Sequence, residues 1–147
     1  MMAPTIFLFF SGNCDEAFGF YAKTLGGKIS VKSHYRDMPP SPDHPTVPEA
    51  HHHLVMHITL ELGDGSRIHG SDNAPGIDPP LEIGNNFSVS IQTDAKVDAD
   101  RIHEALAAGG VVTMAMQDTF WGSYFGSCKD RFGVKWIVAC NSDTSNS

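Results

Sequence analysis

The chain has 147 residues, of which 41% are hydrophobic and 18% charged, and its 17 acidic and 10 basic side chains give a formal net charge of -7. This length supports one well-buried core, so we predict a single globular domain over residues 1–147. No two basic residues are adjacent, which argues against binding to nucleic acid or to an anionic membrane surface.

The N-terminal stretch MMAPTIFLFFSG lacks a basic segment, and its apolar run at residues 6–10 is too short for a signal-peptide core or a membrane span. The three cysteines, Cys14, Cys128 and Cys140, are odd in number and widely spaced, without a CxxC pair. Such spacing argues against a disulfide framework and a zinc knuckle. We therefore predict a cytoplasmic protein with reduced thiols.

A strand followed by a helix opens the chain. The apolar stretch TIFLFFSG predicts the strand, and NCDEAFGFYAKTLGG predicts the helix, with Asn13 as its N-cap and Gly26 just past its end. A second strand follows, and then the proline-rich segment RDMPPSPDHPTVPEAHH, residues 36–52. This segment has little apolar periodicity, so we predict an inserted loop and the most mobile part of the chain.

The segment HITLELGDGSRIHGS, residues 57–71, predicts a hairpin that turns about Asp64. Alternation places one set of residues on an apolar face that should meet the helix: Ile58, Leu60, Leu62 and Ile68. The opposite face carries polar groups: His57, Thr59, Glu61, Arg67, His69 and Ser71. Imidazoles, a carboxylate and hydroxyls together favour a binding site, although an exposed polar face would show the same alternation.

The second half of the chain repeats this order. FSVSIQTD, residues 87–94, predicts a strand. A helix should follow, with Asp98 as its N-cap. Val97, just before the cap, would pack against Ile102 as a hydrophobic staple. The helix ends at the double glycine Gly109–Gly110, which leads into another strand.

The offset between the two copies of the repeat changes once along the chain. LGGKISV at residues 25–31 corresponds to AGGVVTM at 108–114, an offset of 83 residues, whereas the turn glycines Gly65 and Gly133 differ by 68. The insert at residues 36–52 accounts for the difference of 15.

The repeat therefore predicts an α+β fold made of two βαβββ modules. We place the first module at about residues 4–72, the second at about 86–140 and a tail at 141–147.

The segment QDTFWGSYFGSCKDRFGVKW, residues 117–136, holds six aromatic residues and three glycines. Glycines let a ligand come close while rings supply apolar area, so this composition favours a pocket wall over a plain core strand. We predict that QDTFWGSYFGSC forms the sixth and seventh strands with their connection. The expected ligand-binding rings are Phe120, Trp121, Tyr124 and Phe125.

Three motifs, FSGNCDEAFGFYAKTLGG, VMHITLELGDGSRIHGSD and QDTFWGSYFGSCKDRFGVKW, together resemble the PhnB-like branch of the vicinal oxygen chelate superfamily, the glyoxalase and bleomycin-resistance fold. Members of this branch are often labelled demethylubiquinone methyltransferase-like. The resemblance extends from Phe7 to about Ala139. It implies paired modules in an open, cupped mixed sheet that binds a small molecule and is usually closed by a second chain.

The superfamily contains metal-dependent lyases, isomerases and dioxygenases as well as drug-sequestering proteins without catalysis. Methyltransferase chemistry finds no support in this chain, because no glycine-rich strand-to-helix turn marks a nucleotide-cofactor site.

The resemblance also implies where a metal would bind, because metal-using members take ligands from the first and last strands of each module. The first strand here offers none, the position in the second module falls near Ser88, and Ile137 stands where a carboxylate would. Only His69 can coordinate, and one imidazole cannot hold a divalent ion that needs three or four donors. We therefore predict no cofactor. A rebuilt metal site from His57, Glu61 and His69 remains an alternative.

Three residues are candidates for acid–base chemistry. His57 and His69 should lie on adjacent strands within reach of one substrate-sized group, or else be hydrogen-bonded to each other in a polar cup. Asp118 is either a base or a loop cap. Glu61 and Arg67 should form a structural ion pair across the hairpin.

These observations predict a small-molecule binding protein that holds its ligand between the aromatic wall and the face of His57, Thr59 and His69. The alternative is an enzyme of unknown reaction that uses the rebuilt metal site or acid–base catalysis by His57, His69 and Asp118. A purely structural or regulatory dimer is a third possibility. In each case we expect a homodimer, because open half-cups leave edges that a second copy would cover.

Overall fold

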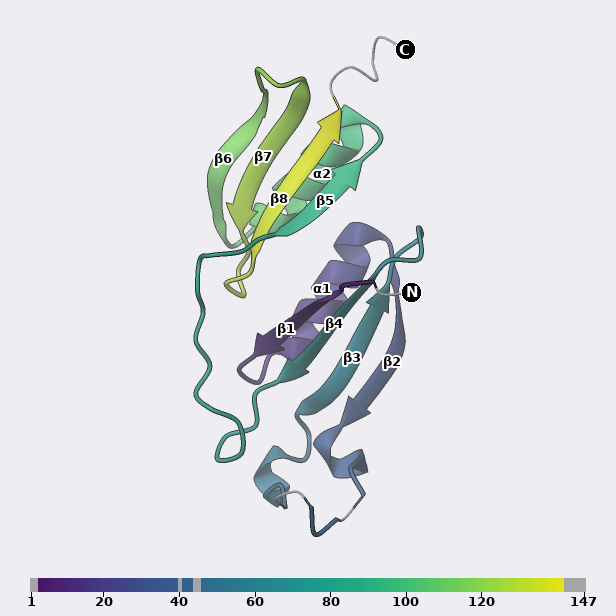
Figure 1. Ribbon diagram of the computed structural model, residues 1–147, viewed down its shortest axis with the longest axis vertical. Coiled ribbons are helices and arrows are strands. Elements are labelled where there is room, and N and C mark those ends of the chain that lie inside the picture. Colours follow the sequence, from purple (N-terminus) through teal and green to yellow (C-terminus); the bar gives the residue numbers. More distant parts are fainter. Residues whose placement is uncertain (1–2, 40, 44–45, 142–147) are drawn as a thin grey trace. The chain divides into compact units, whose positions relative to one another are not determined.

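The computed structural model describes residues 3–39, 41–43 and 46–141 and divides into two compact units, Met1–Glu82 and Ile83–Ser147 (Figure 1). Each unit contains a four-stranded sheet and one α-helix. Within the described residues, no helix is long and apolar enough to cross a membrane.

Unit 1 has the order strand, helix, three strands: β1 (Ile6–Phe10), α1 (Cys14–Leu25), β2 (Lys28–His34), β3 (Val55–Glu61) and β4 (Arg67–Asp72). The spatial order is β1-β4-β3-β2, in which β1 and β4 are parallel and the other neighbours antiparallel. The hairpin pairs Thr59 with His69 and Glu61 with Arg67. The predicted turn about Asp64 is therefore confirmed.

Unit 2 repeats the order: β5 (Val89–Thr93), α2 (Lys96–Ala107), β6 (Val111–Asp118), β7 (Ser123–Lys129) and β8 (Lys135–Asn141). Its spatial order is β5-β8-β7-β6, with β5 and β8 parallel. The two βαβββ modules and the α+β class predicted from the sequence are confirmed. The prediction that β6 and β7 flank the aromatic connection is also confirmed.

The strand register reproduces the sequence repeat. Phe7 pairs with His69 in unit 1 and Ser90 pairs with Ile137 in unit 2, so both partners shift by the offsets of 83 and 68 residues. One expectation was wrong: the position opposite Ile137 is Ser90 rather than Ser88, which precedes β5.

The helix of unit 1 covers one face of its sheet. Phe18 and Tyr21 of α1 are fully buried and contact Phe10 at ring-centroid distances of 6.0 and 6.5 Å. Leu60 and Ile68 are buried as well, as the alternation predicts. Burial of these side chains is the main source of stability for the unit.

The predicted N-cap of α1 is replaced by a distant carboxylate. Asn13 occupies the N-cap position but makes no side-chain capping bond. Instead, Asp72 at the end of β4 accepts hydrogen bonds from the backbone N–H groups of Gly12 at 2.9 Å, Cys14 at 3.0 Å and Val55 at 2.9 Å. This buried side chain therefore joins β4 to the start of α1 and of β3.

The expected start of α2 was wrong by three residues, because the N-cap position is Ala95 rather than Asp98. The helix begins at Lys96, so Asp98 lies inside its first turn and does not cap it. Val97 is 73% exposed and does not form the expected staple with Ile102. The strand before α2 also starts later than predicted: β5 begins at Val89 rather than at Phe87.

The insert at residues 36–52 contains packed elements where the structure describes it. Short 3-10 turns cover Tyr35–Asp37 and Glu49–His51, and Val47 is buried. A hydrogen bond of 2.8 Å joins His52 Nε2 to the carbonyl oxygen of Val47. Residues 40 and 44–45 lie outside the described part, and the mobility of the insert stays a prediction.

Candidate functional site

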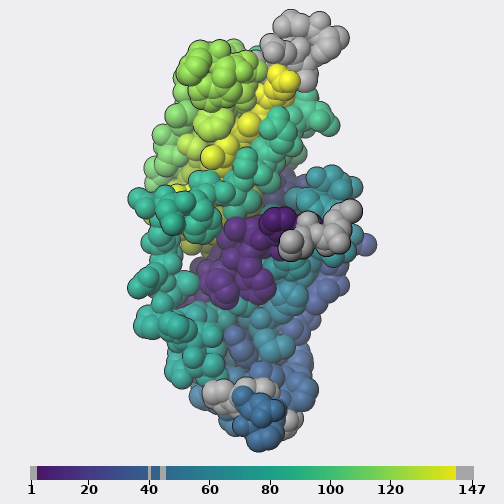
Figure 2. Space-filling model, in the orientation of Figure 1, coloured from purple at the N-terminus to yellow at the C-terminus, as the bar shows by residue number. Residues whose placement is uncertain are grey.

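The side of the unit 1 sheet opposite α1 is the candidate site, and we call it the open face. One row of paired residues crosses all four strands: Phe7 in β1, His69 in β4, Thr59 in β3 and Val31 in β2. Alternation puts Leu8 and Phe10 into the core, so Phe7 and Phe9 must point away from α1. Figure 2 shows β1, in purple, at the surface of its unit.

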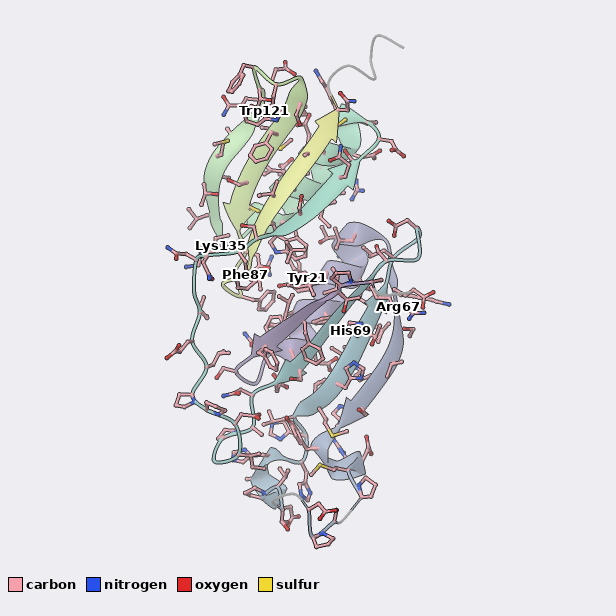
Figure 3. The ribbon with its side chains drawn as sticks, viewed as in Figure 1. Tyr21, Arg67, His69, Phe87, Trp121 and Lys135 are labelled. Carbon is pink, nitrogen blue, oxygen red and sulfur yellow. The ribbon has the colours of Figure 1, made fainter. Side chains whose placement is uncertain are left out.

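Two imidazoles meet in the middle of the open face. His57 Nε2 lies 3.3 Å from His69 Nδ1, and Thr59 Oγ1 lies 3.0 Å from that same Nδ1 atom; Figure 3 labels His69. When both rings are neutral, one of these nitrogens donates and the other accepts. His57 and His69 thus lie on adjacent strands, as predicted, and are hydrogen-bonded to each other, as the alternative interpretation expected; ligand binding by the pair stays a prediction.

Aromatic rings extend this pair towards the sheet edge. The Phe7 ring lies 5.8 Å from His57, 6.0 Å from His69 and 5.0 Å from Phe9 between centroids, with interplanar angles of 12°, 17° and 29°. Phe7 is 43% exposed and Phe9 is 55% exposed. Neither residue was among the predicted site residues, although the alternation along IFLFF indicates that both point away from the core.

The rebuilt metal set predicted as an alternative is not assembled. Glu61 lies at the far end of β3 from His57 and its Oε2 is 4.0 Å from Arg67 Nε, so the expected ion pair forms instead. Within the described residues, no group of three or more His, Cys, Asp or Glu side chains is placed to hold a metal ion.

The strand positions that supply ligands in metal-using relatives also do not fit a divalent ion. The paired positions are Phe7 and His69 in unit 1 and Ser90 and Ile137 in unit 2. Benzyl and butyl side chains donate no electron pair, and a serine hydroxyl is a weak ligand compared with imidazole or carboxylate. We therefore derive no chemistry through a metal at these positions.

The aromatic residues predicted for ligand binding in unit 2 separate into two groups. Phe120 and Trp121, in the turn between β6 and β7, are 98% and 59% exposed, and the Trp121 ring lies 5.9 Å from Phe125 (Figure 3). Tyr124 points to the helix side, where its hydroxyl donates to Asp100 Oδ1 at 2.6 Å. Tyr124 therefore does not share a face with Phe125.

Asp118, the third candidate for acid–base chemistry, lies at the end of β6. Its carboxylate forms an exposed ion pair of 3.2 Å with Lys96 at the start of α2. The structure thus gives Asp118 a structural contact on the helix side of unit 2. The imidazole pair belongs to unit 1.

The protonation of His69 follows from its surroundings. Burial first, then the charge of His57 and that of Arg67, hold the pKa of His69 below its ordinary value of 6.5. We expect His69 to be neutral at pH 7 and to lose its proton below pH 6.5 in an NMR titration. Because the unfolded chain binds this proton at a higher pH than the folded chain, acidification through 6.5 should favour unfolding through this group.

A His57→Gln variant gives the matched test of this pKa. Removing the neighbouring imidazole should raise the pKa of His69, while burial should still keep it below 6.5. A midpoint for His69 at or above 6.5 in the unmodified protein would contradict the account.

Comparison with known proteins agrees with this architecture. Protein YjdN of Escherichia coli (strain K12) is 30% identical over 140 residues, which cover 90% of each chain. The crystal structure of protein PA1353 from Pseudomonas aeruginosa has a TM-score of 0.80 at 36% identity and covers 95% of this chain and 98% of that chain.

A PhnB protein from Bacillus cereus, described as a putative 3-demethylubiquinone-9 3-methyltransferase, shares the fold with a TM-score of 0.71. It is 22% identical, and the match covers 95% of this chain and 99% of that one. The sequence profile of the Glyoxalase/Bleomycin resistance protein/Dioxygenase superfamily matches residues 5–138. The chain therefore belongs to this superfamily.

Proposed function

We propose that the protein binds a small organic molecule on the open face of unit 1. The ligand would rest a flat apolar part on Phe7 and Phe9 and direct a hydrogen-bonding group to His57, Thr59 or His69. The observation that carries the proposal is the juxtaposition of half-exposed rings with a hydrogen-bonded imidazole pair on the sheet face opposite α1.

The energetics favour a ligand of this mixed character. Binding is favoured when a ligand removes exposed apolar rings from water, and each stacked pair of rings adds about 0.5–1.5 kcal/mol to the binding free energy. The imidazole pair supplies direction, because each neutral ring has one donor and one acceptor. An apolar surface with a few convergent polar groups is the usual composition of a ligand site.

The proposal is tested with three simple probes: p-cresol, benzamide and benzoate. Each is titrated in ligand-observed NMR against the unmodified protein and a Phe7→Ser variant, with Phe87→Ser as control because Phe87 is also about half exposed but lies in unit 2. We expect Phe7→Ser to weaken binding of at least one probe roughly 2- to 10-fold. Binding that is unchanged in Phe7→Ser, or absent for all three probes, would overturn the proposal.

We further propose that ligand binding needs no metal cofactor. Untagged protein dialysed against a weak chelator should contain well below one equivalent of any divalent metal, and a His69→Ala variant should contain no less. The test is elemental mass spectrometry of both proteins. About one equivalent in the first and none in the second would support a metalloenzyme instead.

A homodimer is part of the proposal. The edge strand β6 exposes three apolar side chains, Val111 (58%), Val112 (51%) and Met114 (40%), and edge strands with apolar side chains are commonly covered. Light scattering at micromolar concentration should report twice the mass of the 147-residue chain. A monomer at that concentration would contradict this part.

The imidazole pair also supports a second candidate, an acid–base enzyme. The His57–His69 hydrogen bond and the lowered pKa of His69 give a neutral imidazole that can accept a proton near pH 7. Turnover of a bound carbonyl compound that is lost in His57→Gln, with binding retained, would favour this candidate over simple binding.

A further inference from the structure

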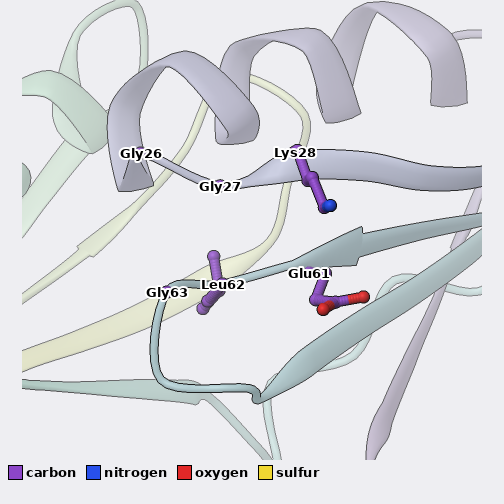
Figure 4. A pocket seen from close by; sticks show the side chains of 6 residues that line it. All are labelled: Gly26, Gly27, Lys28, Glu61, Leu62 and Gly63. Carbon is purple, nitrogen blue, oxygen red and sulfur yellow. The ribbon is translucent and has the colours of Figure 1, made fainter.

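The two units contain equivalent pockets where the helix turns into the next strand. In unit 1 a pocket of about 330 Å³ lies at the end of α1, lined by Gly26, Gly27, Lys28, Glu61, Leu62 and Gly63 (Figure 4). In unit 2 a pocket of about 390 Å³ lies at the end of α2. The repeat offsets map Gly26 and Gly27 onto Gly109 and Gly110, which line that second pocket.

The backbones of the two pockets correspond closely. Gly26 and Gly109 both adopt the left-handed conformation, with φ of 77° and 78°. Gly27 packs against the carbonyl oxygen of Glu61, and Gly110 packs against that of Lys129, the residue 68 positions later. The backbone at the end of each helix is therefore equivalent in the two pockets.

The two pockets share the glycines at the end of the helix but differ in their side chains: Val111, Lys129, Asp130 and Arg131 of unit 2 correspond to Lys28, Glu61, Leu62 and Gly63 of unit 1. In unit 2, Arg131 lies across the end of the helix: its Nε donates to the carbonyl oxygen of Ala108 at 3.2 Å and is 3.2 Å from the place of a Cβ on Gly109. Subtracting 68 from 131 gives Gly63, so unit 1 has no side chain at the corresponding position. No described heavy atom beyond the immediate chain neighbours lies within 4 Å of a Cβ placed on Gly26 or on Gly63.

We propose that the pocket of unit 1 binds a guanidinium group supplied by a ligand, in the place that Arg131 takes in unit 2. The group would donate to the carbonyl oxygen of Leu25, the counterpart of Ala108. It would also complement the negative end of the α1 dipole. Glu61 also lines the pocket, and although its Oε2 lies 4.0 Å from Arg67 Nε, its negative charge near the pocket favours a cation.

Lys28 in the pocket wall does not exclude a cation. The unit 1 pocket contains one lysine and one acidic residue, Lys28 and Glu61, and the unit 2 pocket contains Lys129 and Asp130 besides Arg131. The two walls thus have the same formal charge, and unit 2 holds a guanidinium in addition.

The test uses a variant that fills the pocket from within. Gly63 has no positive φ and no neighbour near its Cβ position, so Gly63→Arg introduces the side chain of unit 2 without backbone strain. Gly63→Ala is the matched control. N-Ethylguanidinium is titrated to about 20 mM at low salt, where interactions between exposed charges are least screened, and is followed by backbone amide shifts.

We expect saturable shifts at Gly26, Gly27 and Lys28 in the unmodified protein and in Gly63→Ala, and at least a tenfold loss of affinity in Gly63→Arg. N-Ethylammonium should bind at least fivefold more weakly, because it lacks the planar fork. Absent shifts, equal binding of the two cations, or full binding to Gly63→Arg would each overturn the proposal.

A second titration identifies the source of the group. The peptide N-acetyl-Gly-Arg-Gly-amide contains an arginine side chain in a polypeptide. Binding tighter than that of N-ethylguanidinium assigns the pocket to an arginine of a partner chain, and equal or weaker binding assigns it to a small molecule. Both outcomes support a guanidinium site.

Discussion

Replacing Asp72 with alanine is expected to lower the free energy of unfolding by roughly 3–5 kcal/mol. The variant removes the acceptor of three backbone hydrogen bonds, from Gly12, Cys14 and Val55, at a side chain that is only 2% exposed. A bond to a charged acceptor contributes about 1.5–3 kcal/mol, and the three are not independent because they share one carboxylate. Urea unfolding of the full chain measures the effect as a lower midpoint.

Asp94→Ala is the matched control, because Asp94 is exposed and its carboxylate makes no hydrogen bond to the described residues. This variant should unfold within about 0.5 kcal/mol of the unmodified protein. If Asp72→Ala were as stable as Asp94→Ala, the role assigned to Asp72 in joining α1, β3 and β4 would be wrong.

Gly110→Ala is expected to destabilise the protein by about 3 kcal/mol or more. A Cβ at this position would overlap the carbonyl oxygen of Lys129 and approach the backbone of Asp130. Neither neighbour is the end of a flexible side chain, so the connection between α2 and β6 must move away from the end of β7 to admit one methyl group. The change should appear in thermal unfolding as a large decrease in Tm.

Gly19→Ala, the same substitution at another site, is expected to change the free energy of unfolding in the opposite direction. Gly19 lies within α1, and no heavy atom outside the helix lies within 4 Å of its Cβ position in the described part of the chain. Alanine should stabilise the helix by about 0.5–1 kcal/mol through its higher helix propensity. Equal effects of the two substitutions would show that the tight contact at Gly110 is not real.

Local patterns in the sequence were enough to predict most of the fold. The helical spacing of Cys14, Phe18 and Tyr21 identified the buried face of α1, and all three side chains are buried. Alternation about Asp64 gave the hairpin register and brought His57 next to His69. These features depend on residues close in sequence, whose periodicity reports directly on burial.

The errors lie where distant residues decide the local structure. Asp72 is 60 residues from Gly12, so no local capping rule could find the carboxylate at the start of α1. Lys96 at the start of α2 pairs with Asp118 of β6, and the helix begins there rather than after the more typical cap Asp98. Short-range rules describe only residues that neighbour one another in the chain.

The candidate site was likewise predicted only where it depends on residues close in sequence. The polar half was predicted, because HITLELGDGSRIHGS contains both of its strands. The apolar half was missed, since Phe7 joins His69 only through the parallel pairing of β1 with β4 across 62 residues. Tyr124 was assigned to the pocket by composition, whereas strand alternation directs it towards Asp100 on α2.

The crystal structure of the protein with its strongest-binding probe, among p-cresol, benzamide and benzoate, is the most direct test of the proposed function. The account predicts density for the ring of the probe in contact with Phe7, with a polar atom of the probe within hydrogen-bonding distance of His57, Thr59 or His69. Density for the probe elsewhere, or a metal ion held by His57 and His69 instead of the probe, would contradict it.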